Sequence, residues 1–288
     1  MTGFSLALEE ITLVLFTTLA PAGAVAYILL ALASFGADQD ASRRIQRFLL
    51  APLMVVLVGL VASATHLGNP ENALYVLSRV GQSPLSTEVA TAVVFLGIAG
   101  VQWMYQYAER YRRGFSRGLL VAASLAALGM VVAIAFAYAS RTVLSWNTAY
   151  VPLLTGLNAA MAGPLLALAV LVWAQRKATA GGFGRALLVG CIAALGLGVV
   201  VYLMQGECLA DLENTYITAM QLVPHYSWCV VAYGVLGATA WGLDAAAIFR
   251  RCPLPQWAAI CACLLALLAV FVMRCSFYAM HLTVGMGW

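Results

Sequence analysis

Charged side chains are scarce in this chain. Asp, Glu, Lys and Arg make up 9% of its 288 residues, whereas a water-soluble domain carries about 25%. With 64% apolar residues and a mean hydropathy of +0.93, a soluble globular fold is excluded. No segment is long and polar enough to form a soluble domain, so we expect any large catalytic unit to lie on another chain.

Motifs for common catalytic chemistry are also missing. The sequence has no Gly-rich phosphate loop, nucleophile elbow or zinc motif. Its seven cysteines form no disulfide or metal framework, and most fall in apolar segments, where a free thiol packs as a small apolar group. Cys208 lies in a connector and could pair, but no partner is evident. The net charge of +4 is modest and does not indicate nucleic-acid binding.

Long apolar runs are what the chain has in abundance. A helix needs about 20 apolar residues to cross the hydrocarbon core. The first run is too long for a signal peptide and begins with Glu9 and Glu10 in place of a basic region. We therefore predict an all-α integral membrane protein, a single membrane domain over residues 1–288. Its eight predicted spans are 8–35, 44–67, 85–107, 116–139, 149–174, 184–206, 227–249 and 256–282.

The basic residues predict the orientation of these spans. Connectors one, three, five and seven hold 12 of the 15 lysines and arginines, and such connectors stay in the cytoplasm. Acidic residues favour the opposite side. Both termini and the connector 66–88 are therefore predicted to lie outside the cytoplasm.

A weak internal repeat divides the sequence. Shifting it by 138 residues aligns Trp103 with Trp241 and Gly68 with Gly206. It also places Arg112 and Arg113 on Arg250 and Arg251. Four spans separate the copies, so residues 1–140 and 141–288 are predicted to form two parallel four-helix bundles. His66, Arg79 and Glu88 have no counterpart under this shift, which assigns the chemistry to the first half alone.

The connector 66–88 is unusually polar for this protein. His66 ends the second span, before Gly68 and Pro70 stop the helix, and Glu88 opens the third. Both can face one cleft at the outer surface, where a histidine beside a carboxylate is a plausible proton acceptor for a hydroquinone. Two alternatives remain open. His66 could be hydrogen-bonded at the interface, and Glu88 could cap its helix.

Further polar residues could support this cleft. Arg79 could polarise a quinone carbonyl or pair with Glu71 or Glu88. Tyr75 could form a ring wall or an interface anchor, and Ser86 precedes Glu88.

A second group of polar residues lies at the end of the last span. Arg274 and His281 lie two helical turns apart on one face. They are second-tier candidates, because snorkelling to the interface also explains an arginine there.

The remaining polar residues carry weaker signals. His225 is expected to be a solvated connector residue, and the acidic cluster Glu207, Asp211 and Glu213 has no metal-loop spacing. All three histidines fall near the outer face, so two haems stacked across the membrane are excluded. His66 and His281 could still ligate one haem between them.

The sequence resembles the membrane-anchor subunit of the dimethyl sulfoxide reductase family along nearly its full length. The most specific stretch is H-L-G-N-P…L-S-R-V-G-Q-S-P-L-S-T-E at 66–88. Supporting stretches are A-G-P-L-L at 162–166, M-Q-G-E-C-L-A at 204–210, L-V-P-H-Y at 222–226 and R-C-S-F-Y-A-M-H-L-T-V-G-M at 274–286.

This resemblance implies a haem-free menaquinol oxidase subunit in the bacterial cytoplasmic membrane. Its expected partners are a four-cluster iron–sulfur subunit and a molybdopterin-bearing catalytic subunit, with no metal in this chain. It implies His66 and Glu88 as the menaquinol site, and Arg79 matches as well. Asn72 departs from the family pattern, which often has an arginine there.

Two other functions remain possible at this stage. A solute or ion transporter would also carry polar residues within an internal repeat, but its helices should be broken near the midplane. A purely structural anchor would dock the partner subunits without binding quinol.

Overall fold

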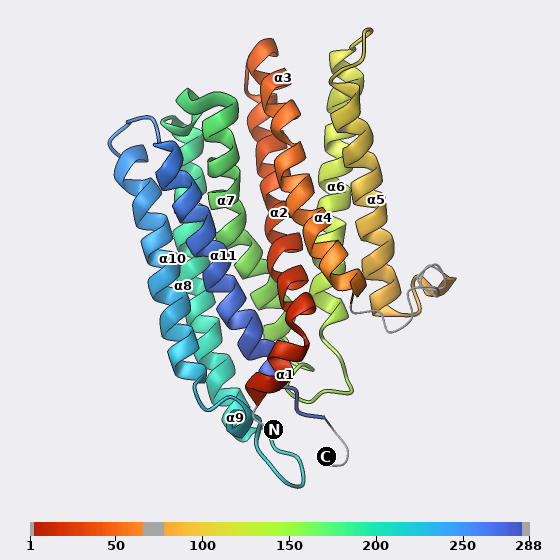
Figure 1. Ribbon diagram of the computed structural model, residues 1–288, viewed down its shortest axis with the longest axis vertical. Coiled ribbons are helices and arrows are strands. Elements are labelled where there is room, and N and C mark those ends of the chain that lie inside the picture. The colour runs from red at the N-terminus through yellow and green to blue at the C-terminus, as the bar shows by residue number, and fades with distance from the viewer. Residues whose placement is uncertain (1–2, 66–77, 284–288) are drawn as a thin grey trace.

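The computed structural model describes residues 3–65 and 78–283 (Figure 1). His66, Gly68, Asn72 and Tyr75 lie outside the described residues. Within the described ranges the protein is helical and has no β-strand. The helices are α1 Gly3–Glu9, α2 Ile11–Phe35, α3 Gln39–Phe48, α4 Leu50–Thr65, α5 Pro84–Tyr105, α6 Arg113–Ala137, α7 Tyr150–Thr179, α8 Gly182–Asp211, α9 Ala219–Leu222, α10 Tyr226–Ile248 and α11 Gln256–Ala279.

The eight predicted spans are confirmed. Eight helical segments among the described residues are long and apolar enough to cross a membrane. The second of them starts earlier than expected, at Gln39, because the polar helix α3 continues almost directly into α4. The two helices separate at Leu49, since Pro52 has no N–H to offer to the carbonyl oxygen of Phe48.

Helices α2 and α7 form the centre of the molecule. Both are apolar around most of their circumference and are largely buried, as central helices should be. They contact each other closely. At Gly163 of α7 a Cβ atom would lie 2.5 Å from Val25 Cγ1 of α2, so only glycine permits this approach.

The remaining long helices pack around this central pair. α7, α8, α10 and α11 contact one another in a ring. In the first half α2 contacts α4 and α6, and α5 contacts α6. The indoles of Trp103 and Trp241 both donate to a backbone carbonyl of a neighbouring span, those of Arg47 and Leu188, at 2.9 Å. The equivalence of the two halves as four-helix bundles remains a prediction.

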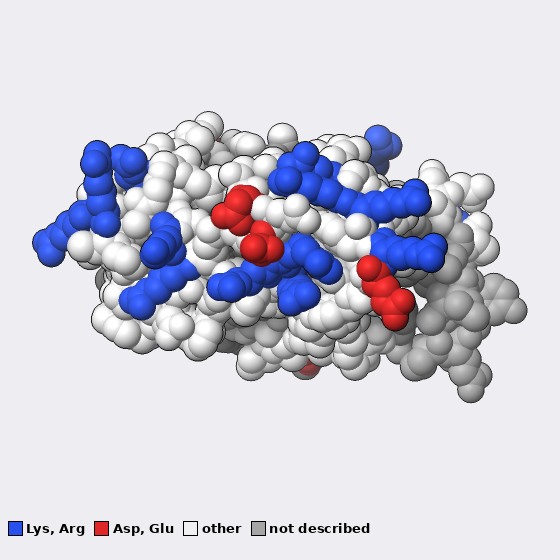
Figure 2. Space-filling model, turned by 90° about the horizontal axis from the view of Figure 1, so that it is seen from above, with Lys and Arg blue, Asp and Glu red and all other residues white. Residues whose placement is uncertain are grey.

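Lysine and arginine gather at one end of the bundle. Figure 2 shows this face from above, with most of its charged area basic. Its connectors join α2 to α3, α5 to α6, α7 to α8 and α10 to α11, whereas both termini and α9 lie at the opposite end (Figure 1). We call these the basic end and the terminal end. The charge asymmetry is that of a multi-pass membrane protein.

Buried polar side chains near the basic end of the first half are joined by hydrogen bonds. Ser116 donates to Gln46 Oε1 at 2.7 Å, and Gln102 donates to the same oxygen at 3.1 Å. Tyr27 donates to Gln102 Oε1 at 3.3 Å, and Gln106 donates to Ser116 at 3.1 Å. Such a network holds helices together where apolar burial alone supplies no specificity.

Candidate functional site

Glu88 lies in the second turn of α5, at the terminal end. The helix begins after a turn in which Gly81 adopts φ 81°, a left-handed conformation that suits glycine. Ser83 is the N-cap and its hydroxyl accepts from Ser86 N–H at 3.5 Å, while the Thr87 hydroxyl donates to the Ser83 carbonyl at 3.0 Å. These residues perform the capping, so the alternative that Glu88 serves as the cap is wrong.

The Glu88 side chain points into the protein. It is 1% exposed and shares the inner face of α5 with Ala92 and Phe95, and Phe95 packs edge-on against Tyr27 of α2 at 5.3 Å. Its Oε2 atom has no hydrogen-bond partner among the described residues. Burying a carboxyl group with an unsatisfied oxygen is costly, so a purely structural origin for this residue is poorly supported.

Two tyrosines, Tyr138 and Tyr278, lie within electrostatic range of both Glu88 and Arg274. Tyr138 follows the end of α6, and its ring meets that of Tyr278 from α11 at 6.0 Å. Burial raises the pKa of the Tyr138 hydroxyl well above its ordinary value, Tyr278 and Glu88 raise it further, and Arg274 lowers it. Glu88 and Arg274, from α5 and α11, therefore both lie within electrostatic range of Tyr138.

Arg274 is held inside the bundle. It is 4% exposed, and its Nη2 donates to Thr155 Oγ1 of α7 at 2.7 Å. The alternative that this arginine snorkels to the interface is therefore wrong. A cavity of about 10 Å³ beside it is large enough for about one water molecule.

His281 lies beyond the end of α11 and does not meet Arg274 directly. An aromatic stack separates the two. The Arg274 guanidinium lies 5.6 Å from the Phe277 ring, Phe277 stacks on Trp146 at 4.7 Å, and Trp146 contacts His281 at 4.8 Å. Burial lowers the pKa of His281, and the nearby Glu10 opposes that shift.

Arg79 and Glu88 are not brought together. Arg79 is exposed in the turn before α5, whereas Glu88 is buried, so the alternative in which Arg79 pairs with Glu88 is wrong. Ser86 is buried on the same helix, at 4% exposure. Because His66 lies outside the described residues, its contact with Glu88 remains a prediction, as does the pairing of Arg79 with Glu71.

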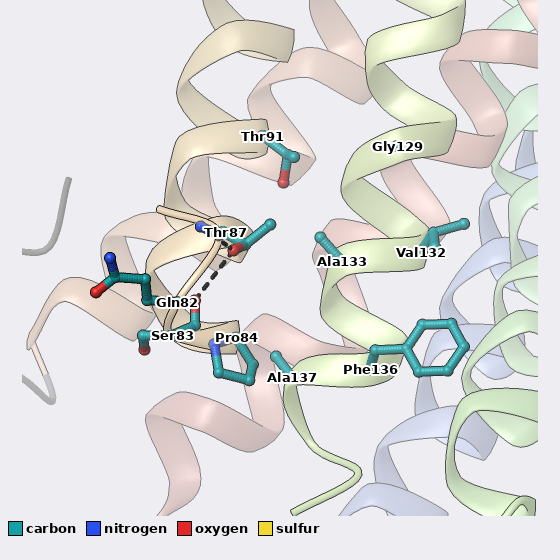
Figure 3. A pocket seen from close by; sticks show the side chains of 11 residues that line it. Gln82, Ser83, Pro84, Thr87, Thr91, Gly129, Val132, Ala133, Phe136 and Ala137 are labelled. Carbon is teal, nitrogen blue, oxygen red and sulfur yellow. Dashed lines mark hydrogen bonds between the residues drawn. The ribbon is translucent and has the colours of Figure 1, made fainter. Parts of the chain in front are cut away.

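A groove of about 400 Å³ lies between α5 and α6 near the terminal end (Figure 3). Thr87, Thr91 and Phe136 line it, and Glu88 is absent from its wall because it occupies another face of α5. The described residues that line the groove include no acid or base.

The other polar candidates are solvent-facing. His225, at the N-cap of α10, is exposed as predicted. Glu207, Asp211 and Glu213 are exposed at the terminal end. Across the described residues no group of three His, Cys, Asp or Glu side chains could hold a metal ion, and all seven cysteines are free.

Sequence reasoning missed Asp244 of α10. This side chain is fully buried, and neither carboxylate oxygen has a hydrogen-bond partner among the described residues. It lies within electrostatic range of the thiols of Cys191 and Cys263 from α8 and α11. The available signal was a lone acidic residue inside the apolar run W-G-L-D-A-A-A-I.

Comparison with known proteins identifies the family. Residues 4–280 match the DMSO reductase anchor subunit (DmsC). The sequence is 30% identical to the anaerobic dimethyl sulfoxide reductase chains YnfH and C of Escherichia coli, and each alignment covers 97% of both proteins. It is 26% identical to the corresponding anaerobic dimethyl sulfoxide reductase protein of Haemophilus influenzae at the same coverage. The protein therefore belongs to the DMSO reductase anchor subunit family, whose members anchor a molybdoenzyme complex in the membrane.

Proposed function

We propose that this anchor oxidises menaquinol beside Glu88 and delivers the electrons to an iron–sulfur subunit docked on its terminal end. That subunit, expected to carry four clusters, would pass them to a molybdopterin-bearing catalytic subunit. The family supports the existence of both partners. The observation that carries the quinol assignment is Glu88 itself, a buried carboxyl with an unsatisfied oxygen near the terminal end of a span.

Quinol oxidation requires this chain to supply a proton acceptor rather than a cofactor. Oxidation of a quinol to a quinone releases two electrons and two protons. Glu88 would receive protons directly or through His66, whose neutral imidazole is suited to the task near pH 7. Arg79, exposed just before α5, would contact the partner subunit rather than Glu88. No haem is required in this chain, because electrons would leave directly to the first iron–sulfur cluster.

We further propose that the terminal end faces away from the cytoplasm of a bacterium. The basic end carries the retention signal, and Glu88 lies near the opposite end. Protons and electrons would then leave on the same side of the membrane. Turnover by this subunit would therefore be electroneutral.

The transporter alternative gains little support from the described residues. A midplane binding site is typically formed by broken helices, whereas the interruptions at Leu49 and Gln175 both lie near the basic end. Asp244 is buried, but it is only four residues from Ile248, where α10 ends at that same end.

The decisive experiment compares two electron donors in the assembled complex. Glu88→Gln and His66→Ala should each abolish reduction driven by menaquinol while leaving reduction by an artificial soluble donor intact. Asp244→Asn is the matched control, since it removes another buried carboxylate far from the proposed site, and it should retain both activities. Full quinol activity in Glu88→Gln would refute the proposal, and loss of assembly in His66→Ala would assign that residue a structural role.

A further inference from the structure

Arg274 is a buried cation without a counterion among the described residues. It is 4% exposed, and its side chain contacts neutral groups, the Thr155 hydroxyl at 2.7 Å and the Phe277 ring at 5.6 Å. Its Nε atom has no hydrogen-bond partner in the described part of the chain, and no described carboxylate, Glu88 included, forms an ion pair with it. An arginine stays charged even when it is buried, and an uncompensated buried charge is costly. This guanidinium therefore calls for an anion.

A cavity beside Arg274 lies where α7, α8 and α11 meet. Its volume is about 10 Å³, Tyr202 and Gln205 are its other polar lining residues, and apolar side chains complete its wall. The described residues that line it include no acid. A cavity of this size accepts one particle the size of a water molecule, and a chloride ion is only slightly larger.

The polar side chains around this cavity have hydrogens to donate rather than oxygens free to accept. Gln205 Oε1 already accepts from the Tyr226 hydroxyl at 3.0 Å, and the amide NH2 of Gln205 donates to no described residue. The Tyr202 oxygen accepts from Asn158 Nδ2 at 2.7 Å, and that bond does not use the Tyr202 hydrogen. A water molecule needs acceptors as well as donors, whereas an anion needs donors alone. The set of donors therefore fits an anion.

We propose that this cavity binds a small monovalent inorganic anion, such as chloride, which neutralises Arg274 inside the bundle. The anion lies beside the guanidinium and accepts hydrogen bonds from Gln205 and Tyr202. These ligands come from α8 and α11, and Thr155 ties Arg274 to α7. The bound anion thus joins three helices of the second half, and this role does not depend on quinol oxidation.

The test is a chloride titration of the assembled complex in detergent. Gluconate, which is too large for the cavity, keeps the ionic strength constant. We expect the unfolding temperature to rise by about 3 °C or more and then to saturate, with bromide acting like chloride, and we expect radioactive chloride to bind. Equal unfolding temperatures in chloride and gluconate, without bound radioactive chloride, would mean that the cavity holds water only and would overturn the proposal.

A substitution at Gln205 supplies the missing negative charge from the chain itself. Gln205→Glu puts a carboxylate at the cavity that can still accept from Tyr226. This variant should lose the chloride response and bind one radioactive chloride fewer than the wild type. Gln221→Glu is the matched control, because Gln221 is exposed in α9 at the same end and its side chain accepts from Thr218 N–H at 3.2 Å, a capping role that glutamate keeps. It should respond to chloride as the wild type does.

A substitution at Arg274 tests the same site from the other partner and stands in if Gln205→Glu does not assemble. Arg274→Met removes the positive charge and keeps an unbranched side chain. It should also lose both the chloride response and one bound chloride. A response that persists in either variant would place the anion elsewhere in the complex and overturn the assignment to this cavity.

Discussion

Arg274 Nη2 donates a hydrogen bond to Thr155 Oγ1 at 2.7 Å and thereby joins α11 to α7 inside the bundle. The interaction is charge-assisted and buried on both sides, which places it among the stronger hydrogen bonds of a protein. It also fixes the guanidinium, which lies within electrostatic range of Tyr138 and Tyr278.

Thr155→Val should therefore destabilise the protein. It keeps the shape of the side chain but leaves the Arg274 guanidinium without that acceptor, at a cost of about 1–3 kcal/mol. Thermal unfolding of the detergent-solubilised complex measures the loss. Thr239→Val is the matched control, because the Thr239 hydroxyl bonds only to Val235 of its own helix on an exposed face. Equal unfolding temperatures for the two variants would contradict a role for the Arg274–Thr155 bond.

The contact between α2 and α7 predicts a second pair of variants. Gly163→Ala would place a Cβ 2.7 Å from Val25 Cβ, which cannot move without its helix, so we expect a cost of about 1–3 kcal/mol. Gly156→Ala on the same helix meets nothing within 4 Å and should be neutral or slightly stabilising. The free energy of unfolding of each variant, measured by chemical denaturation, tests this prediction. A neutral Gly163→Ala would mean that the two central helices are not packed as described.

The spans and the two ends of the fold could be predicted from the sequence because the membrane constrains them. Apolar runs and basic connectors specify the spans and the two ends, because unpaired backbone groups and charges are costly in hydrocarbon. The break at Leu49 was missed, because the polar helix α3 precedes the hydropathic part of its span. Hydropathy identifies segments that are buried in lipid, and it does not predict a polar helix at the edge of the membrane.

His281 provides a pH-dependent prediction. Burial lowers its pKa below the ordinary value of 6.5, so the unfolded protein binds more protons than the folded one in the interval between the two values. Stability should then be complete above about pH 6.5 and decline as the pH falls through the folded pKa. Glu10→Gln removes the opposing carboxylate and should extend the decline to lower pH. The slope of unfolding temperature against pH from 5 to 8 measures this, and a His281→Gln variant that keeps the wild-type slope would contradict it.

The orientation can be tested with thiol chemistry. Cys252 is exposed in the connector between α10 and α11 at the basic end. In a Cys208→Ser background, a membrane-impermeant maleimide should label Cys252 only after the cells are permeabilised. Thr215→Cys, in the exposed connector between α8 and α9, should be labelled in intact cells. The reverse pattern would place the termini in the cytoplasm.

The candidate site was only partly predictable. Glu88 could be singled out because an acid at the end of an apolar span is rare, yet its inward direction depends on the turn at Gly81 and the cap at Ser83. Sequence spacing put Arg274 and His281 on one face, but α11 ends between them, at Ala279. The contact between Tyr138 and Tyr278 was missed, because it joins the connector after α6 to α11, and a single sequence does not report contacts between distant helices.

Photo-crosslinking can show whether menaquinol binds beside Glu88. A photoreactive menaquinol analogue would be activated in membranes holding the assembled complex, with and without excess menaquinol, and the modified residues mapped by mass spectrometry. We predict that residues 66–77 or the first turns of α5 are labelled, and that excess menaquinol suppresses this labelling. If menaquinol suppresses labelling only in residues 141–283, the quinol binds in the second half and not beside Glu88.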